Sequence, residues 1–148
     1  MGIGRLVTCV LAAGVTQFLV GTLFHFGVPL VATSIPPQFA NSNLFRPWEG
    51  WTSTYMVVHP FWFGAAFATV YLFLRSRQLV DRGWRHGLAY GAGVFVVGSL
   101  PVFLLVLASF QVSPEIIAAW VLQNACQYLL AGVVLGVVAK SAGQDSAS

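Results

Sequence analysis

Four stretches of the chain are each long and apolar enough to cross a lipid bilayer as a helix. They cover about residues 6–31, 53–74, 84–110 and 114–139. About 20 consecutive apolar residues span the hydrocarbon core of a bilayer, and a helix suits that environment because it forms its backbone hydrogen bonds within one segment. The sequence therefore predicts an all-α integral membrane protein, a four-helix transmembrane bundle that forms one domain over residues 1–140.

Charged side chains are too scarce for a water-soluble fold of this size. They make up 7% of the 148 residues, and hydrophobic side chains make up 57%, whereas an average soluble domain is about 25% charged. The net charge of +3 follows from basic residues expected at one membrane face, so it does not indicate a nucleic-acid partner. We expect the lipid bilayer to be the main partner, and a membrane protein or a second copy of the chain to be a further one.

The basic residues predict how the helices are oriented. In the four-helix arrangement, six of the seven fall on one side and only Arg46 falls on the other. The six are Arg5, Arg75, Arg77, Arg82, Arg85 and Lys140. Because basic residues in short loops mark the cytoplasmic side, we expect a multi-pass protein of the plasma (cytoplasmic) membrane with both termini in the cytoplasm. The loop 32–52 then lies outside, and the polar tail 141–148 is expected to be disordered in the cytoplasm.

Two segments of the chain resemble each other. Phe18–Phe26 and Phe95–Phe103 are identical at five of nine positions. Both lie in a helix that is expected to leave the cytoplasm, so one interpretation is a bundle of two duplicated helical hairpins. Chance similarity between apolar segments is the alternative.

Small residues spaced four apart indicate where helices pack closely. The pattern occurs in Gly64–Ala68, Gly87–Gly91 and Gly132–Gly136. In a bilayer such residues let two backbones approach, and van der Waals packing then replaces the hydrophobic effect as the driving force. We expect these three segments to lie at helix contacts.

Polar side chains inside apolar spans are costly, so they point to candidate sites. Counting along the helices places several of them in the outer half of the bilayer, where they are expected to line one ligand pocket. The residues of this candidate pocket are His25, His59, Asn124, Gln127 and Tyr128. The aromatic outer loop above it supplies a candidate lid, formed by Arg46, Trp48 and Glu49.

The two histidines allow a more specific hypothesis. His25 and His59 on facing helices would be suitable axial ligands for haem b. The alternative is that each imidazole forms a hydrogen bond across helices or reaches interfacial water. The cofactor, if there is one, is not identified by the sequence, and Cys9 and Cys126 are expected at different depths, unable to form a disulfide.

No sequence motif with a known mechanism is present, neither G-x-S-x-G nor H-E-x-x-H. Whether the protein is an enzyme stays open, and a non-enzymatic role is favoured. The leading hypothesis is a membrane protein that binds a small apolar or amphipathic ligand, or a partner subunit, through the outer polar pocket. One alternative is a redox subunit linked to haem b or a quinone. The other is a small oligomeric transporter or channel lined by Gln123, Asn124 and Gln127.

Overall fold

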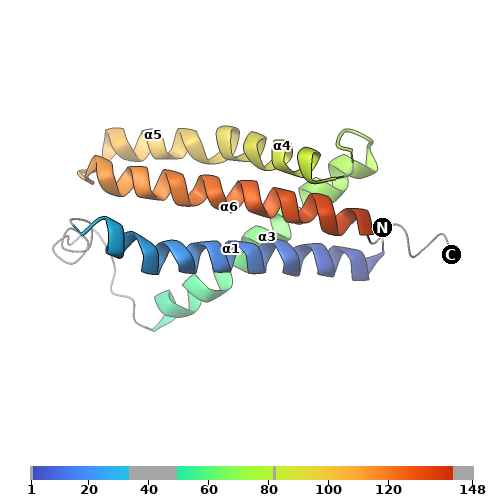
Figure 1. Cartoon of the computed structure of the whole chain (residues 1–148), viewed down its shortest axis with the longest axis horizontal. Coiled ribbons are helices and arrows are strands. Elements are labelled where there is room, and N and C mark those ends of the chain that lie inside the picture. Colours follow the sequence, from blue (N-terminus) through green and yellow to red (C-terminus); the bar gives the residue numbers. More distant parts are fainter. Residues whose placement is uncertain (1, 34–49, 82, 142–148) are drawn as a thin grey trace.

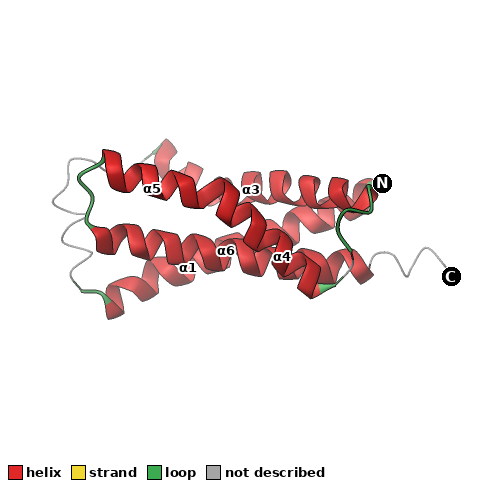
Figure 2. Ribbon diagram, turned by 90° about the horizontal axis from the view of Figure 1, so that it is seen from above, coloured by secondary structure: helices red, strands yellow, loops and turns green. Residues whose placement is uncertain are grey.

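The computed structural model describes residues 2–33, 50–81 and 83–141, and every element in them is a helix (Figure 2). The elements are α1 (Ile3–Val31), α3 (Trp51–Ser76), α4 (Trp84–Val94), the π-helical segment η1 (Phe95–Ser99), α5 (Leu100–Ser109) and α6 (Pro114–Ser141). Segments η1 and α5 continue α4 without a break. The described residues therefore contain four helices that are long and apolar enough to cross a membrane, as the all-α prediction requires.

The helices run alternately up and down the long axis of the molecule (Figure 1). We call the end where α1 begins and α6 ends the termini end. The opposite end, where α1 ends and α6 begins, is the loop end. In Figure 1, α3 crosses behind the other helices obliquely, with its first turns beyond α1 and its last turns near the start of α4.

A turn of π-helix interrupts the third long helix. Pro101 lies at the start of α5, directly after η1. Proline has no N–H, so it cannot donate to the carbonyl of Val97 one helical turn earlier. A π-helical turn is one way to accommodate such a local disturbance of the hydrogen-bond ladder.

The end of α3 has a well-defined backbone motif. The N–H of Leu79 donates to the carbonyl of Leu74 at 3.0 Å, and the N–H of Gln78 donates to that of Arg75 at 3.1 Å. These two bonds form a Schellman motif, which requires a left-handed residue after the helix. Gln78 takes that position with φ of 59°, although glycine is the usual residue there.

Glycines form the contact between α4 and α6. A Cβ atom on Gly87 would overlap the carbonyl oxygen of Gly132, and a Cβ on Gly91 would overlap that of Tyr128. A Cβ on Gly136 of α6 would overlap the carbonyl oxygen of Gly83, the residue directly before α4. The expected close contact at Gly87–Gly91 and Gly132–Gly136 is therefore confirmed.

A second close contact joins α1 to α3. A Cβ on Gly64 would lie 2.7 Å from the backbone nitrogen of Gly14 and 2.8 Å from the carbonyl oxygen of Val10. Ala68, one turn further along α3, is fully buried. The segment Gly64–Ala68 thus also lies at a helix contact, as its sequence pattern indicates.

The buried core lies in the half of the bundle nearer the termini end. It is built from the first half of α1, the second half of α3 and the second half of α6. Its members are Cys9, Ala13, Phe67, Ala68, Tyr71, Leu72, Ala131, Leu135 and Ala139. Toward the loop end the packing is looser: α5 has no buried residue, and every described side chain from Trp51 to His59 is exposed.

Candidate functional site

Three glutamines meet where α1 packs against α6. Gln127 donates from Nε2 to the backbone carbonyl of Gln17 at 3.1 Å. Gly21 makes room for this approach, because a Cβ there would lie 3.0 Å from Nε2 of Gln127 and 3.7 Å from Nε2 of Gln123. We call Gln17, Gln123 and Gln127 the amide cluster.

One member of the amide cluster has an unused hydrogen-bond donor. Gln17 is 4% exposed, and its Nε2 atom is buried with no hydrogen-bond partner among the described residues. An unsatisfied buried donor costs about 1–3 kcal/mol. The seam between α1 and α6 therefore contains a polar group whose desolvation is not compensated in this conformation.

Tyr128 lies in an aromatic cluster that joins three helices. Its ring centroid is 4.8 Å from that of Phe63 and 5.8 Å from that of Phe67, both on α3. It is 6.1 Å from the ring of Phe95 in η1. Tyr128 thus packs between helices, and Tyr90 extends the cluster by donating its hydroxyl to the carbonyl of Phe67 at 2.8 Å.

Asn124 is half-buried and bonds within its own helix. Its Nδ2 donates to the carbonyl of Trp120 at 3.0 Å. Of the three predicted pocket residues on α6, only Gln127 has a hydrogen bond to another helix among those described. The structure therefore brings Gln127 together with Gln17, which was not among the predicted pocket residues.

Both histidines of the predicted pocket are exposed toward the loop end. His25 makes an edge-on ring contact with Phe26 at 5.0 Å, and His59 has a tilted ring contact with Tyr55 at 5.5 Å. Each of these contacts is with a neighbour on the same helix.

The two histidines differ in height along the bundle. Helices α1 and α3 meet at Gly14 and Gly64. From that contact His59 lies five residues, or roughly 8 Å, toward the loop end, and His25 lies eleven residues, or roughly 16 Å, in the same direction. Two imidazole nitrogens bound to one metal would be about 4 Å apart. The haem hypothesis stays a prediction that a visible absorption spectrum would test.

The remaining predictions concern the candidate lid, the tail, a metal site and the two cysteines. Arg46, Trp48 and Glu49, the candidate lid, lie outside the described residues, as does the tail 142–148. Within the described ranges, no group of three or more His, Cys, Asp or Glu side chains is arranged to hold a metal ion. Cys9 and Cys126 are both free thiols.

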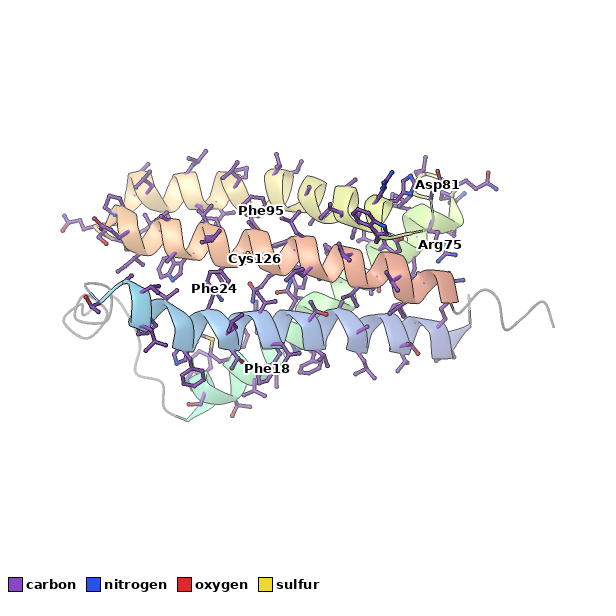
Figure 3. All side chains as sticks on the ribbon, viewed as in Figure 1. Phe18, Phe24, Arg75, Asp81, Phe95 and Cys126 are labelled. Atoms are coloured by element: carbon purple, nitrogen blue, oxygen red, sulfur yellow. The ribbon has the colours of Figure 1, made fainter. Side chains whose placement is uncertain are left out.

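Two phenylalanines of α1 lie on different sides of this helix, and the start of α3 is exposed. Phe24 lies between α1 and α6, and Phe18 lies on the opposite side of α1 (Figure 3). The first turns of α3 carry exposed aromatic side chains, including Trp51 at 65% and Tyr55 at 53% exposure. From Pro60 onward one face of α3 is buried against its neighbours. The exposed side chains of this half of the bundle therefore include those of the first turns of α3 and of the end of α1.

The amide cluster could have been expected from residue spacing. Gln17 and Gly21 are four residues apart, as are Gln123 and Gln127, so each pair shares one face of its helix. A glycine beside a glutamine on one helix and two glutamines on another is a pattern suited to a polar contact between them. The spacing of residues within a helix does not predict which two helices face each other.

Comparison with protein-family models, with curated proteins and with solved structures finds no match to this chain.

Proposed function

We propose that the chain is a multi-pass integral membrane protein with both termini in the cytoplasm. Support comes from the four long apolar helices and from the large apolar side chains on their outer surfaces. Leu23, Trp62 and Leu105 are between 64% and 69% exposed, and lipid is the solvent that such surfaces require. The basic residues of the α3–α4 turn support a cytoplasmic position for the termini end.

The finer architecture that we propose is a pair of duplicated hairpins, α1 with α3 and the third long helix with α6. The alignment of Phe18–Phe26 with Phe95–Phe103 also pairs Gly14 with Gly91. Each of these two glycines lies where its helix meets the next one along the hairpin. Equivalent glycines at equivalent contacts support duplication over chance similarity.

The role that we propose is non-enzymatic binding of a small amphipathic ligand in the half of the bundle nearer the loop end. The observation that carries this proposal is that every described side chain of α3 from Trp51 to His59 is exposed. A helix whose first two turns are exposed while its second half packs in the core leaves side chains that a ligand can reach laterally from the bilayer.

The side chains around this opening suit a ligand with an apolar body and a polar head. Trp51, Met56 and Val57 supply apolar surface, with exposures of 65%, 47% and 55%. The imidazoles of His25 and His59 supply groups that donate or accept hydrogen bonds. A binding site with mostly apolar walls and a few polar groups is the usual composition of a small-molecule site.

Native mass spectrometry of the detergent-purified protein tests this proposal. The wild-type protein should retain a ligand of discrete mass, and His59→Leu should retain at least about tenfold less of it, because a hydrogen bond to a charged head group is worth about 1.5–3 kcal/mol. His86→Leu is the matched control, since His86 lies at the other end of the bundle beside Asp81. Equal retention by His59→Leu and His86→Leu would contradict a site at the loop end.

A further inference from the structure

The third long helix changes the face that it turns toward α6. In its first half this face carries Gly87 and Gly91, whose Cβ atoms would overlap backbone atoms of α6. Because an α-helix has about 3.6 residues per turn, Gly98, seven residues after Gly91, belongs to the same face. The structure instead leaves no neighbouring atom within 4 Å of where a Cβ on Gly98 would lie, and it buries Ser99. The buried face is therefore displaced by one residue.

The π-helical turn η1 lies at this displacement and accounts for it. The N–H of Leu100 donates to the carbonyl of Phe95, five residues earlier, where an α-helix would pair residues four apart. A turn that holds one more residue sets every later residue back by about 100° around the helix axis. The half-buried residues of α5, Phe103 and Val106, continue the face of Ser99.

The aligned segment of α1 has no such turn. It lies within an α-helix that runs from Ile3 to Val31, and Gly21, the residue aligned with Gly98, lies against glutamine amides of α6. Phe24 stands in α1 where the third long helix has Pro101, and its side chain lies between α1 and α6 (Figure 3). In the first hairpin this segment is thus α-helical, and its glycine lies at a helix contact.

Helix α5 is held only loosely in its present rotation. The structure describes all 10 of its residues, and none of them is buried. Its sequence, LPVFLLVLAS, is apolar around the whole helix as far as Ser109. Because lipid tails are as apolar as these side chains, turning α5 exchanges one lipid-facing apolar side chain for another at little cost in solvation.

We propose that η1 is a register switch in the loop-end half of the third long helix. In a second conformation the π-turn becomes α-helical, Gly98 takes the place of Ser99, and each residue of α5 moves to the place of the residue after it. Helix α5 then turns by about 100°, and residues 111–113 before α6 take up a rise of about 1.5 Å. The first half of the helix stays in place, since Gly87 and Gly91 fix it against α6.

Two opposing costs keep the conformations close in free energy. The α-helical form leaves the carbonyl of Val97 without its donor, because Pro101 has no N–H. The π-helical form leaves Gly98, a residue type that weakens a helix interior, without the close contact that would compensate for it. The proposal draws support from the duplicated hairpins but depends on the period of the helix alone, and it is independent of the ligand site.

Fluorine NMR of a tagged cysteine tests the switch. With both native cysteines replaced by alanine, Val102→Cys carries the tag, and dissolved oxygen broadens the signal of a tag that faces lipid. Val102 is 55% exposed and takes the half-buried place of Phe103 in the second conformation. Leu104→Cys is the control, because residues 104 and 105 are 59% and 64% exposed and its tag stays in lipid. We expect less broadening at Val102 than at Leu104.

Two variants move the switch in opposite directions. Deletion of Val97 removes the additional residue of the π-turn and leaves α5 where it is, so a tag at Val102 should broaden as much as one at Leu104. Pro101→Ala supplies the missing N–H and should lower the broadening at Val102 below that of the wild type. The ratio of the α-helical to the π-helical form should rise at least about tenfold, because an interior proline strongly disfavours an α-helix.

Three results decide the question. Less broadening at Val102 than at Leu104 that is restored by deletion of Val97 supports the switch. Equal broadening at Val102 and Leu104 in the wild type would overturn it, whatever Pro101→Ala does. The same broadening at Val102 in the wild type and in the deletion variant would overturn it as well. If Pro101→Ala does not fold, Pro101→Phe restores the residue of the first hairpin.

Discussion

Gly87 and Gly132 face each other so closely that a Cβ on either one would overlap the carbonyl oxygen of the other. This reciprocal contact sets the distance between α4 and α6. Neither position can take a residue with a side chain, because the atoms that a Cβ would meet belong to the backbone of the opposite helix and cannot rotate away. Glycine is therefore required at both positions by geometry.

The contact predicts a strong effect of one methyl group. Gly132→Ala should destabilise the protein by about 3 kcal/mol or more, at the upper end of the usual cost of overpacking. Gly93→Ala is the control, since a Cβ at Gly93 would have no neighbour within 4 Å. Unfolding by denaturing detergent measures both variants. Equal stability of the two would contradict the close contact between α4 and α6.

Much of this fold follows from the sequence, for physical reasons. Apolar length predicts the helices, and the glycine pairs on α4 and α6 predict which faces approach. The oblique course of α3 does not follow. It depends on how Gly64 fits against Gly14 and how Phe61 packs beside them, and sequence periodicity carries no information about such a crossing.

The amide cluster predicts opposite effects at two glutamines. Gln17→Leu should stabilise the protein by about 1 kcal/mol, because it removes a buried donor that has no partner. Gln127→Leu should destabilise it by about 0.6 kcal/mol, the average value of a hydrogen bond between membrane helices. The same unfolding measurement serves for both. Destabilisation by Gln17→Leu would mean that its amide has a partner in the membrane, such as water or a ligand.

The turn after α3 predicts a stabilising substitution. Gln78→Gly should raise the free energy of unfolding by about 1 kcal/mol, because the left-handed conformation is less favourable by about that amount for a residue with a side chain than for glycine. Arg77→Gly, one residue earlier at φ of −91°, should give no gain. A gain at residue 77 and none at residue 78 would contradict the Schellman motif.

The candidate site was less predictable than the fold. The sequence identifies Gln127 as a polar residue in an apolar helix, but its partner Gln17 depends on the pairing of α1 with α6. His25 and His59 look equivalent when each is counted from the outer end of its own helix. They differ in height once the helices are aligned on Gly14 and Gly64, and that alignment comes only from packing.

Cysteine labelling tests the orientation. In a background with Cys9→Ala and Cys126→Ala, Gln111→Cys should react with a membrane-impermeant thiol reagent in intact cells. Gln78→Cys, at the other end of the bundle, should react only after the membrane is permeabilised. Both side chains are exposed, so access and not burial decides the result. The reverse pattern would invert the proposed topology.

The ligand site at the open end of α3 is tested most directly by photo-cross-linking in living cells. A photoreactive phenylalanine analogue is placed at Tyr55 in one variant and at Phe73 in the other, since these aromatic residues of α3 are almost equally exposed, at 53% and 55%. At Tyr55 we expect one adduct of discrete small-molecule mass, and at Phe73 the range of masses of the bulk phospholipids. The same range of phospholipid adducts at both positions would contradict a ligand site beside His59.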